Sequence, residues 1–565
     1  YYFINQMNLG GIPIVLSERQ LCELEMLLNG SLQPVQTYLD SRDYYSVVDE
    51  MKLADGQFFP MPVYLSLSEH VITQKNISLG SVLELCNSEN LPLARLEISE
   101  IYHPDWEREC LKVYGSTDQN HPYVKELLSR TEKYLNCSGQ LTAVNPFFHS
   151  DFAHLRKTPA QAKEIIRQRD WDYVIGFQTR NPMHRAHFEI TANAIARVTA
   201  EFPEQRVALL LTPTVGVTQE CDLDYFTRVK CYLNLLPVYA QRQISVELIL
   251  VPLAMRMAGP REALYHALIR RNYGCTHFVI GRDHAGPSYK PSDLSRSSFY
   301  GPYEAQELAL KYQRELAIQP VVTKELVYQS EFDRYVEKKA GETDNLPSIS
   351  GTKFRQMLLD GSEIPGWFSF PEVIHVLREN LRKPEQTGFC IYCYGLSGAG
   401  KTTLVKAFQQ RLMMENLHQR QITILDADVI RQHLSQGLGF SAADRSMNVQ
   451  RIGYVASEIV KHGGICLVAN IAPFQRDRLI NRERISAQGE YIQVWVNTPV
   501  EVCEQRDVKG LYQQARLGKI NLTGINDPFE TNDSSEVILD SSQSKQLVEG
   551  VEKLITMLKE KHLIN

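Results

Sequence analysis

Residues 176–187, GFQTRNPMHRAH, form the stretch that decides how this chain is organised. An apolar run at 173–175 precedes the stretch and predicts a buried strand. The residues that follow, 188–196, are helix-prone, and Pro182 is well placed to start the helix. The stretch is therefore predicted to be a turn from a strand into a helix, which is where α/β sheets bind ligands.

Two histidines and an arginine give this turn its chemistry. His184 and His187 are spaced so that both rings lie on one side of a first helical turn. Arg180 adds a permanent cation and Asn181 an amide. Because a helix N-terminus presents unpaired N–H groups and a partial positive charge, the turn predicts a site for polyanionic phosphate. A bare H-x-x-H leaves open the alternative of a surface turn with an ordinary histidine pair.

Two further loops with polar side chains follow in the segment 161–325, which alternates strands and helices as a doubly wound α/β sheet does. They are LTPTVGVTQECDLDYFTRVKCY (211–232) and GRDHAGP (281–287), separated by LAMRMAGPREALYHALIRRNYG (253–274). The loop GRDHAGP places Gly, Arg, Asp and His directly after an apolar strand. Taken alone, it is equally compatible with a surface cluster of ion pairs.

A second nucleotide site begins after a polar, proline-containing linker at 381–388. A predicted buried strand leads into GLSGAGKTT (395–403), which fits G-x-x-x-x-G-K-T, and a helix-prone segment follows. This pattern predicts a P-loop, whose backbone N–H groups cradle phosphates. Lys401 would reach the β- and γ-phosphates, and Thr402 could ligate magnesium.

Length, charge and hydropathy limit the number of domains and the kinds of partner. The 565 residues are enough for about three or four domains. The net charge of −6 disfavours nucleic acid and acidic membranes as partners, because both select a basic face. The sequence shows no bilayer-spanning apolar run and no signal peptide, and Met7 rather than Tyr1 is a possible native start.

Eleven cysteines are scattered along the chain, and such an odd, unclustered set predicts reduced thiols and a cytoplasmic location. Cys390 and Cys393 form a C-x-x-C pair within a predicted strand. Because side chains alternate along a strand, this spacing points the two thiols to opposite faces. We therefore expect neither metal binding nor redox chemistry from the pair.

QTRNPMHRAH, MRMAGPREA, GRDHAGP and FYGPYEAQ resemble ATP sulfurylases (sulfate adenylyltransferases). MKLADGQFFPMPVYL resembles the PUA-like N-terminal domain of that family, and residues 349–379 resemble its small third domain. The resemblance implies attack of sulfate on the α-phosphorus of ATP, which gives adenylylsulfate and pyrophosphate. Thr212 departs from the family, which usually has histidine there, so the phosphate contacts of that loop stay open.

The resemblance also implies the roles of individual residues. Gln178 and Arg180 would hold sulfate and the α-phosphate, and His184 and His187 would stabilise the triphosphate. The remaining residues implied are Thr179 and Asn181 in the active turn, Gly281, Arg282, Asp283 and His284 along the nucleotide, Ala285 near sulfate and Val327 against adenine.

Segments 425–453 and 506–530 resemble adenylylsulfate kinases, which transfer the γ-phosphoryl group of ATP to the 3′-hydroxyl of adenylylsulfate. Lys401 and Asp428 would be catalytic, with Asp428 as candidate base for the hydroxyl proton or as a carboxylate beside the metal; a helix cap there is compatible with either role. Ala472 replaces the family's usual serine, which excludes a phosphoserine intermediate there.

The kinase residues implied fall into three groups. ATP would be bound by Gly395, Ser397, Gly398, Ala399, Gly400, Lys401, Thr402 and Thr403. Adenylylsulfate would be bound by Asp428, Arg431, Phe440, Arg445, Asn448, Ile471, Lys509 and Phe529, with the two phenylalanines around adenine and Lys509 in a lid. Thr402 and Asp426 would hold Mg²⁺.

The predicted fold is a multidomain α/β protein. Its predicted parts are a β-rich PUA-like domain (1–165), a Rossmann-like nucleotidyltransferase domain (166–325), a small α/β third domain (326–383) and a P-loop kinase domain (384–565). The predicted function is bifunctional sulfate activation, from sulfate through adenylylsulfate to 3′-phosphoadenylylsulfate. Two alternatives are a sulfurylase whose kinase-like domain is only a regulatory binding module, and a nucleotide-binding module without sulfur chemistry.

The predicted partners are small molecules. They are ATP, sulfate and adenylylsulfate, with Mg²⁺ accompanying ATP and no tightly bound organic cofactor. Nucleic acid and membranes are not expected as partners, and a homo-oligomer is expected.

Overall fold

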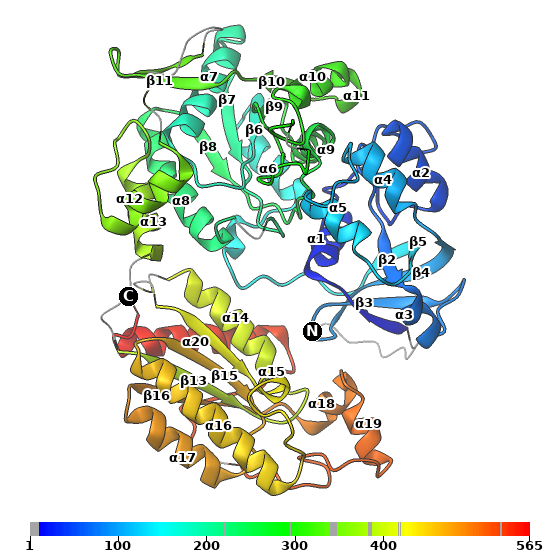
Figure 1. Cartoon of the computed structure of the whole chain (residues 1–565), viewed down its shortest axis with the longest axis vertical. Coiled ribbons are helices and arrows are strands. Elements are labelled where there is room, and N and C mark those ends of the chain that lie inside the picture. Colours follow the sequence, from blue (N-terminus) through cyan, green and yellow to red (C-terminus); the bar gives the residue numbers. More distant parts are fainter. Residues whose placement is uncertain are drawn as a thin grey trace. The chain divides into compact units, whose positions relative to one another are not determined.

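The computed structural model of the chain separates into two compact units (Figure 1). The first takes residues 11–88, 92–147 and 154–377, and the second takes the remainder of the described chain. The residues described are 11–219, 222–293, 295–338, 347, 349–381, 387–415, 417, 420–531 and 534–564. Within them, no helix combines the length and apolarity needed to cross a membrane.

The first sheet of the chain has the strand order β1-β3-β4-β5-β2, with β1 parallel to β3 and the other pairs antiparallel. Its strands are β1 (Ile12–Val15), β2 (Leu65–Ser68), β3 (Val82–Cys86), β4 (Pro92–Tyr102) and β5 (Tyr134–Ala143). Helices α1 (Glu18–Leu28), α2 (Ser41–Glu50), α3 (Glu69–Gln74), α4 (Trp106–Val113) and α5 (Pro122–Leu128) accompany it. In β4, Leu96 and Ile98 are buried while Glu97 is exposed, because one face of the sheet packs on the core.

A buried ion pair joins α1 to the segment that precedes α9 (Gly259–Asn272). Glu23 accepts from Arg256 at 2.5 Å, and the two side chains are only 7% and 4% exposed. Arg256 also donates to the carbonyl oxygen of Pro62 at 2.7 Å. Arg261 of α9 donates to the carbonyl oxygens of Pro60 and Val48, so two arginines tie the β-rich part to the next sheet.

Replacing Glu23 by alanine should therefore destabilise the first unit by about 3–5 kcal/mol, because the Arg256 charge would stay buried without its partner. The measurement is the shift of the unfolding transition of this unit in calorimetry or denaturant titration. Glu84→Ala is the matched control, since Glu84 pairs with Arg95 at a more exposed site and should cost about 1 kcal/mol or less. Equal shifts for both variants would contradict the prediction.

The second sheet has the strand order β10-β9-β6-β7-β8, and all its pairs are parallel. Its strands are β6 (Tyr173–Phe177), β7 (Val207–Leu211), β8 (Ser245–Leu248), β9 (His277–Ile280) and β10 (Gln319–Val322). Its helices are α6 (Pro159–Gln168), α7 (Arg185–Glu201), α8 (Tyr225–Gln241), α9, α10 (Glu304–Lys311) and α11 (Gln313–Leu316), with a short 3₁₀ turn η1 (Ala153–Leu155) before them. Because the chain order reverses between β6 and β9, their carboxyl ends form the crevice in which such sheets bind ligands.

The helix after β6 begins later than the sequence predicts. α7 starts at Arg185, so the prediction that Pro182 starts it is wrong by three residues. The reason is a local hydrogen bond, in which His187 Nδ1 accepts from the N–H of His184 at 3.3 Å and makes His184 the N-cap residue. The two rings still lie near each other, with centroids 6.3 Å apart.

The first unit ends with a small hairpin and two helices. Strands β11 (Leu326–Gln329) and β12 (Arg334–Glu337) pair antiparallel, and α12 (Gly351–Asp360) and α13 (Pro371–Leu381) follow. Ser350 caps α12, because its hydroxyl accepts from the N–H of Lys353 at 3.2 Å.

The second unit is built on a parallel sheet with the strand order β14-β15-β13-β16-β17. Its strands are β13 (Phe389–Tyr394), β14 (Ile422–Asp426), β15 (Ile465–Asn470), β16 (Glu490–Val496) and β17 (Val537–Leu539). Its helices are α14 (Lys401–Met413), α15 (Ala427–Gln432), α16 (Ala442–Lys461), α17 (Gln475–Ser486), α18 (Val500–Arg506), α19 (Leu511–Arg516) and α20 (Ser544–Glu560). The central strand β13 leads into the P-loop, which places that loop at a switch point of the sheet.

Both faces of β13 are buried, and they hold the C-x-x-C cysteines. Cys390 packs in the apolar cluster that includes Val449 of α16, whereas Cys393 packs in the cluster that includes Leu404 of α14. The prediction that the two thiols point to opposite faces is confirmed. Burial raises the pKa of Cys393 to about 12, which leaves its thiol protonated and unreactive near neutral pH.

Candidate functional sites

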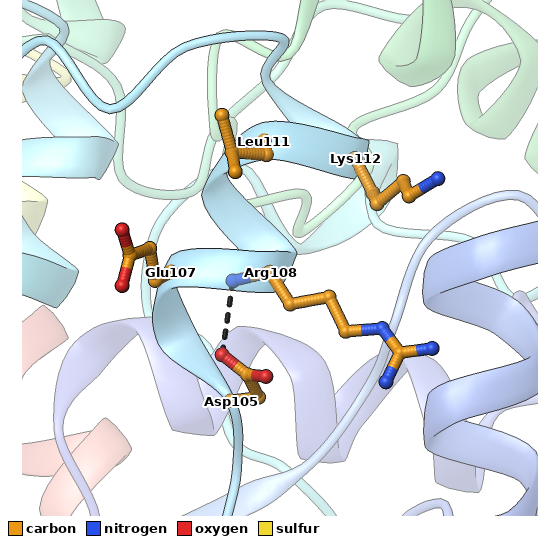
Figure 2. Close-up of a pocket in the computed structure, with 5 residues that line it drawn as sticks. All are labelled: Asp105, Glu107, Arg108, Leu111 and Lys112. Carbon is orange, nitrogen blue, oxygen red and sulfur yellow. Dashed lines mark hydrogen bonds between the residues drawn. The ribbon is translucent and has the colours of Figure 1, made fainter.

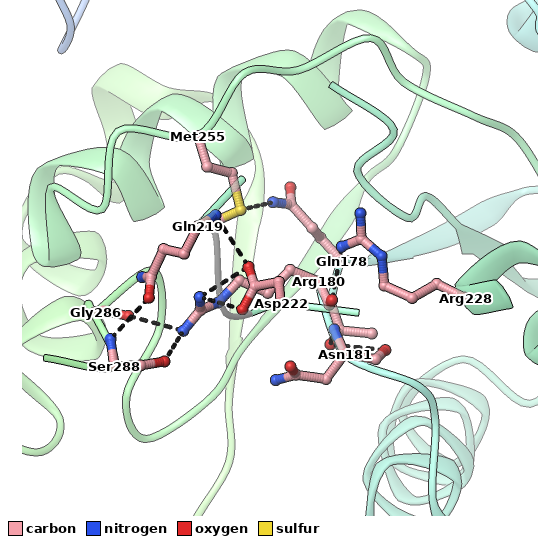
Figure 3. Close-up of polar contacts among 10 residues, drawn as sticks. Gln178, Arg180, Asn181, Gln219, Asp222, Arg228, Met255, Gly286 and Ser288 are labelled. Atoms are coloured by element: carbon pink, nitrogen blue, oxygen red, sulfur yellow. Dashed lines mark hydrogen bonds and ion pairs between the residues drawn. The ribbon is translucent and has the colours of Figure 1, made fainter. Parts of the chain in front are cut away.

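The turn after β6 is held from behind by α8. Tyr232 donates its hydroxyl to the carbonyl oxygen of Asn181 at 3.0 Å, and Arg228 donates to that of Arg180 at 2.6 Å. Within the turn, Thr179 Oγ1 accepts from the N–H of Asn181 at 3.0 Å. Figure 3 shows Gln178, Arg180 and Asn181 gathered at this point. The predicted residues of the turn therefore lie together on a backbone that α8 fixes.

The guanidinium of Arg180 joins three segments of the chain. Its Nη1 lies 3.0 and 3.1 Å from the two carboxylate oxygens of Asp222, and its Nη2 donates to Gly286 O and Ser288 Oγ at 3.2 Å (Figure 3). An anionic substrate would compete with Asp222 for this cation. Asp222 was not predicted, and its only signal in the sequence is its place in the polar loop 211–232.

The two histidines at the start of α7 are surrounded by aromatic rings. The His184 ring lies 5.0 Å from that of Phe354 and 5.1 Å from that of Phe368, and its Nδ1 is 3.0 Å from Ser369 Oγ. Burial, with the neighbouring His187 as the smaller cause, lowers the pKa of His184 to about 3, and burial lowers that of His187 to about 4. Both imidazoles are therefore neutral near pH 7, and a bound polyanion would raise their pKa values.

The GRDH loop follows β9, as predicted, and divides its side chains between two environments. Arg282 and Asp283 are exposed, and Arg282 lies 3.7 Å from Asp283 and 3.9 Å from Glu325. His284 instead turns to the buried His266 of α9, with its Nε2 3.0 Å from His266 Nδ1. Ala285 has a left-handed backbone, and its carbonyl oxygen accepts from the first residue of α9.

Thr212, the departure from the family pattern, is fully buried at the end of β7. Its hydroxyl donates to the carbonyl oxygen of Phe177 at 3.0 Å and accepts from Arg270 Nε at 3.0 Å. The donor of this hydroxyl is thus used inside the protein, and phosphate contacts from the 211–232 loop would have to come from other groups. Val327, predicted against adenine, is a partly buried residue of the β11 hairpin.

The P-loop has the backbone that its glycines predict. Gly398 and Gly400 adopt positive φ, and a Cβ on Gly395 would meet the carbonyl oxygen of Val496 at 2.4 Å, so only glycine fits there. Lys401 donates to the carbonyl oxygen of Leu396 at 2.6 Å. Burial lowers the pKa of Lys401 to about 8, and a phosphate at the loop would raise it again.

Side chains outside the motif support this loop, and the sequence analysis did not identify them. Arg506 donates to Gly398 O at 3.1 Å and to Ser541 O at 2.6 Å, and Tyr512 donates to Ser397 O at 2.7 Å. They come from segments more than a hundred residues downstream of the loop, so no local pattern indicates them.

Thr402 and Asp426 fit a magnesium ion that accompanies ATP. The hydroxyl of Thr402 donates to Asp426 Oδ2 at 2.8 Å, which brings a hydroxyl and a carboxylate oxygen together at the end of β14. Among the described residues, no group of three or more His, Cys, Asp or Glu is placed to hold a metal. Mg²⁺ usually keeps several waters and is bound through one or two protein groups and the substrate phosphates, so these two oxygens suit it.

Asp428 does not cap α15. The N-cap residue is Asp426, whose carboxylate accepts from the N–H of Asp428 at 2.9 Å, so the capping role for Asp428 is wrong. Asp428 instead forms an exposed ion pair with Lys509, the residue predicted for the lid. Both groups thus remain accessible to a ligand.

Among the remaining adenylylsulfate candidates, Arg431 and Arg445 both contact Phe440. Phe440 is 67% exposed, with the Arg431 guanidinium 4.5 Å from its ring centroid, and Arg445 Nε donates to its carbonyl oxygen at 2.8 Å. Arg445 also pairs with Asp527 at 2.7 Å. The ring of Phe529 stacks instead on that of Tyr394. Of the other two candidates, Asn448 is buried and Ile471 is partly buried.

Figure 2 shows a surface hollow elsewhere in the first unit, on α4. It is lined by Asp105, Glu107, Arg108, Leu111 and Lys112. The carboxylate of Asp105 is engaged as the N-cap, and Arg108 forms an ion pair with Asp49. The hollow therefore consists of the exposed face of one helix and shows no catalytic arrangement.

Comparison with known proteins identifies the families of both units. The family model for ATP-sulfurylase matches residues 153–380, that for adenylylsulphate kinase matches 387–540, and that for a PUA-like domain matches 9–146. The sulfate adenylyltransferase of Emericella nidulans is 42% identical over 555 residues, which covers 96% of this chain and 93% of the relative. The chain belongs to the sulfate adenylyltransferase family.

Other members of this family give the same result. The sulfate adenylyltransferase of Gibberella zeae is 41% identical over 550 residues, covering 97% of this chain and 93% of the relative. Among solved structures, the hexameric APS kinase from Thiobacillus denitrificans has 27% identity and a TM-score of 0.54, covering 99% of this chain and 95% of that one.

The prediction of a PUA-like, a nucleotidyltransferase and a P-loop kinase part is confirmed. The chain is a sulfate adenylyltransferase that also carries an adenylylsulfate kinase domain, so it is a nucleotidyltransferase and a phosphotransferase of sulfate activation. The regulatory-module alternative is not favoured, because the P-loop is intact.

Phe440 provides a test of the second site. If its exposed ring is the stacking platform for the adenine of adenylylsulfate, Phe440→Ala should raise the KM for adenylylsulfate about tenfold, the equivalent of about 1–1.5 kcal/mol of stacking, and leave the KM for ATP nearly unchanged. Steady-state kinase assays with each substrate varied in turn measure both constants. Leu517→Ala removes another exposed apolar side chain of this unit and should change neither. Equal increases for both substrates would assign Phe440 to packing.

Proposed function

We propose that the two sites act in sequence on one chain. The first joins sulfate to the α-phosphorus of ATP and releases pyrophosphate, and the second phosphorylates the 3′-hydroxyl of the adenylylsulfate that results. The observation that carries the second step is the complete P-loop, in which Lys401 and the Thr402–Asp426 pair are all in place. A domain that only binds a regulator has no need of a γ-phosphate lysine. Because adenylation of sulfate is unfavourable, a kinase that consumes the product draws the first reaction forward.

In the first site, the chemistry is mainly charge neutralisation, because both reactants are anions. Gln178 and Arg180 would hold sulfate against the α-phosphate, with Arg180 exchanging Asp222 for substrate oxygens. His184 and His187 would donate hydrogen bonds to the triphosphate as charge moves to pyrophosphate. Thr179 and Asn181 set the turn that positions these groups.

The rest of the first site would bind the nucleotide. The GRDH loop at 281–284 would lie along it, with Ala285 near sulfate and Val327 against adenine. This assignment is supported by the position of the loop at the end of β9, beside β6 in the sheet.

In the second site, the 3′-hydroxyl must lose a proton, and Asp428 would accept it. Its present partner, Lys509, would then move to the transferred phosphoryl group. Arg431, Arg445 and Asn448 would hold the phosphosulfate of adenylylsulfate, and further contacts would come from Ile471, Phe440 and Phe529.

The P-loop residues would bind ATP through their N–H groups and through Lys401. Mg²⁺, held by Thr402 and Asp426, would neutralise charge on the phosphates. We assign no tightly bound organic cofactor to either site.

The test uses the purified chain with radiolabelled sulfate, ATP and Mg²⁺, and resolves the products by anion-exchange chromatography. We expect adenylylsulfate first and 3′-phosphoadenylylsulfate second. Adenylylsulfate alone would support the regulatory alternative, and no labelled nucleotide would contradict the whole proposal. Supplying adenylylsulfate directly tests the kinase without the first site.

We also propose a cytoplasmic location, a homo-oligomer and the domain limits 1–165, 166–325, 326–383 and 384–565. The location is supported by the cysteines, since the ten within the described residues are free thiols and nearly all are buried. A homo-oligomer is suggested by the solved hexameric relative, and light scattering on the purified chain tests it. Limited proteolysis tests the domain limits.

A further inference from the structure

A buried chain of polar side chains lies behind the first site. His266 of α9 is fully buried and contacts three such groups. Its Nδ1 lies 3.0 Å from Nε2 of His284, while its Nε2 lies 3.5 Å from Oε1 of Glu262 and 3.4 Å from the amide nitrogen of Gln178. One helix thus touches both loops that the proposed function assigns to substrate.

Glu262 at the base of this chain is an ionised carboxylate. Burial alone would raise its pKa, but hydrogen bonds from His266 and from the backbone N–H groups of Arg256 and Ala258, at 2.8 and 2.9 Å, lower it below its usual value. Burial also lowers the pKa values of His266 and His284, so each ring is neutral near pH 7 and carries one proton. A carboxylate can only accept, so its contact with His266 Nε2 at 3.5 Å favours the tautomer that carries the proton on that nitrogen.

The hydrogen-bond directions follow from this tautomer. If His266 donates from Nε2 to Glu262, its Nδ1 is an acceptor, and His284 must donate to it from Nε2. His284 then presents an unprotonated Nδ1. That nitrogen can accept a hydrogen bond from an O–H or N–H group of a nucleotide.

The amide of Gln178 shares the same proton with Glu262. As placed, its nitrogen lies 3.9 Å from Met255 Sδ and 3.4 Å from Nε2 of His266, while its Oε1 is buried with no hydrogen-bond partner among the described residues. Amide orientation is assigned by hydrogen-bond partners, and half a turn brings Oε1 to the His266 donor. The NH₂ group then points into the position of the unpartnered oxygen, where an anion would satisfy it. Figure 3 shows Gln178 in the turn with Arg180.

We propose that Glu262, acting through His266, is a positioning residue that holds the Gln178 amide as an N–H donor to sulfate and His284 as an acceptor toward the nucleotide. The proposal rests on the proposed function for its choice of ligands. Without Glu262, His266 could carry its proton on either nitrogen, and Gln178 could turn its oxygen toward the anion. A carbonyl oxygen facing sulfate is repulsive, so sulfate binding should suffer first.

The direct test is the tautomer of His266 in the full-length protein. Long-range ¹H–¹⁵N spectra of the ¹⁵N-histidine-labelled chain report which ring nitrogen carries the proton, and His266→Phe and His284→Asn variants assign the two rings. We expect both rings to be protonated on Nε2. A proton on Nδ1 of His266 overturns the inference, even in a chain whose sulfurylase activity is normal.

The kinetic test is Glu262→Gln. Groups that orient a functional imidazole change affinity or activity about 10- to 100-fold when they are altered, so the KM for sulfate should rise by that factor and by more than the KM for ATP. Kinase activity on supplied adenylylsulfate is the internal control. Glu109→Gln is the matched variant, because Glu109 is also a buried carboxylate of the first unit but is bonded to Tyr44 and Tyr64.

The outcomes separate the inference from the proposed function. An unchanged KM for sulfate, or equal losses for both substrates, would overturn the inference while leaving the function intact. If Glu262→Gln does not fold, the tautomer measurement on the unmodified chain decides. A wild-type chain without sulfate-dependent pyrophosphate release would instead overturn the proposed function.

Discussion

Replacing His184 or His187 by alanine is expected to lower sulfate-dependent pyrophosphate release about 10²- to 10³-fold, the loss of about 2–4 kcal/mol of transition-state stabilisation. The physical reason is that charge moves onto pyrophosphate in the reaction, and both rings lie at the N-terminus of α7, where they can donate to it. Kinase activity on supplied adenylylsulfate should be unchanged. Measuring pyrophosphate release and 3′-phosphorylation on the same preparation gives both numbers.

The control for this experiment is His70→Ala, which removes an exposed histidine of α3 and should leave both activities unchanged. Because His184 packs against Phe354 and Phe368, its variant also needs an unaltered unfolding transition before the kinetic loss is assigned to catalysis. Normal pyrophosphate release in both histidine variants would remove these residues from the mechanism.

The low pKa values of the two histidines add a pH dependence to this site. In the ligand-free protein both rings stay uncharged down to about pH 4, since their pKa values lie at about 3 and 4. Burial in the folded protein therefore disfavours protonation of these rings. The free energy of unfolding should fall as the pH drops from their unfolded pKa of about 6.5 toward the folded values of about 4 and 3. Between pH 6 and 8 the histidines act as neutral hydrogen-bond donors, and bound phosphate would raise their pKa values.

The features that the sequence predicts well are local. The turn after β6 and the P-loop each lie within about a dozen residues, and a strand before and a helix after define their surroundings. The start of α7 was still misplaced, because a side-chain contact between His187 and His184, rather than Pro182, sets it. Roles of single residues came from family resemblance and not from pattern alone.

The features that the sequence does not predict depend on contacts between distant segments. Asp222 reaches Arg180 across 42 positions, His266 reaches Gln178 across 88, and Arg506 reaches Gly398 across 108. Each of these partners lies in a helix or a polar loop, where its residue type is common and does not by itself indicate a functional site. The sheet order brings β6 and β9 together, which places the loops that follow these two strands near each other, and it centres β13 in the sheet of the second unit.

Lys401→Ala should abolish 3′-phosphorylation, with a loss of about 10²-fold or more, while the sulfurylase reaction continues. Lys401 is the P-loop cation that can stay bonded to the γ-phosphate during transfer. In the ligand-free protein it donates only to a carbonyl oxygen of the same loop. Overall sulfate turnover should then stall early, because adenylylsulfate accumulates against an unfavourable equilibrium. Added pyrophosphatase should partly restore turnover by removing the other product.

The matched control is Lys406→Ala, which removes an exposed lysine from the same helix and should leave kinase activity unchanged. The fold should tolerate Lys401→Ala, because the lost hydrogen bond leaves only a loop carbonyl, to which water can donate in place of the lysine. If wild-type protein given adenylylsulfate and Mg–ATP makes no 3′-phosphorylated product, the lysine has no catalytic role to lose. The C-terminal domain would then bind nucleotides without phosphorylating them, and its effect would have to be sought in the sulfurylase rate with and without 3′-phosphoadenylylsulfate.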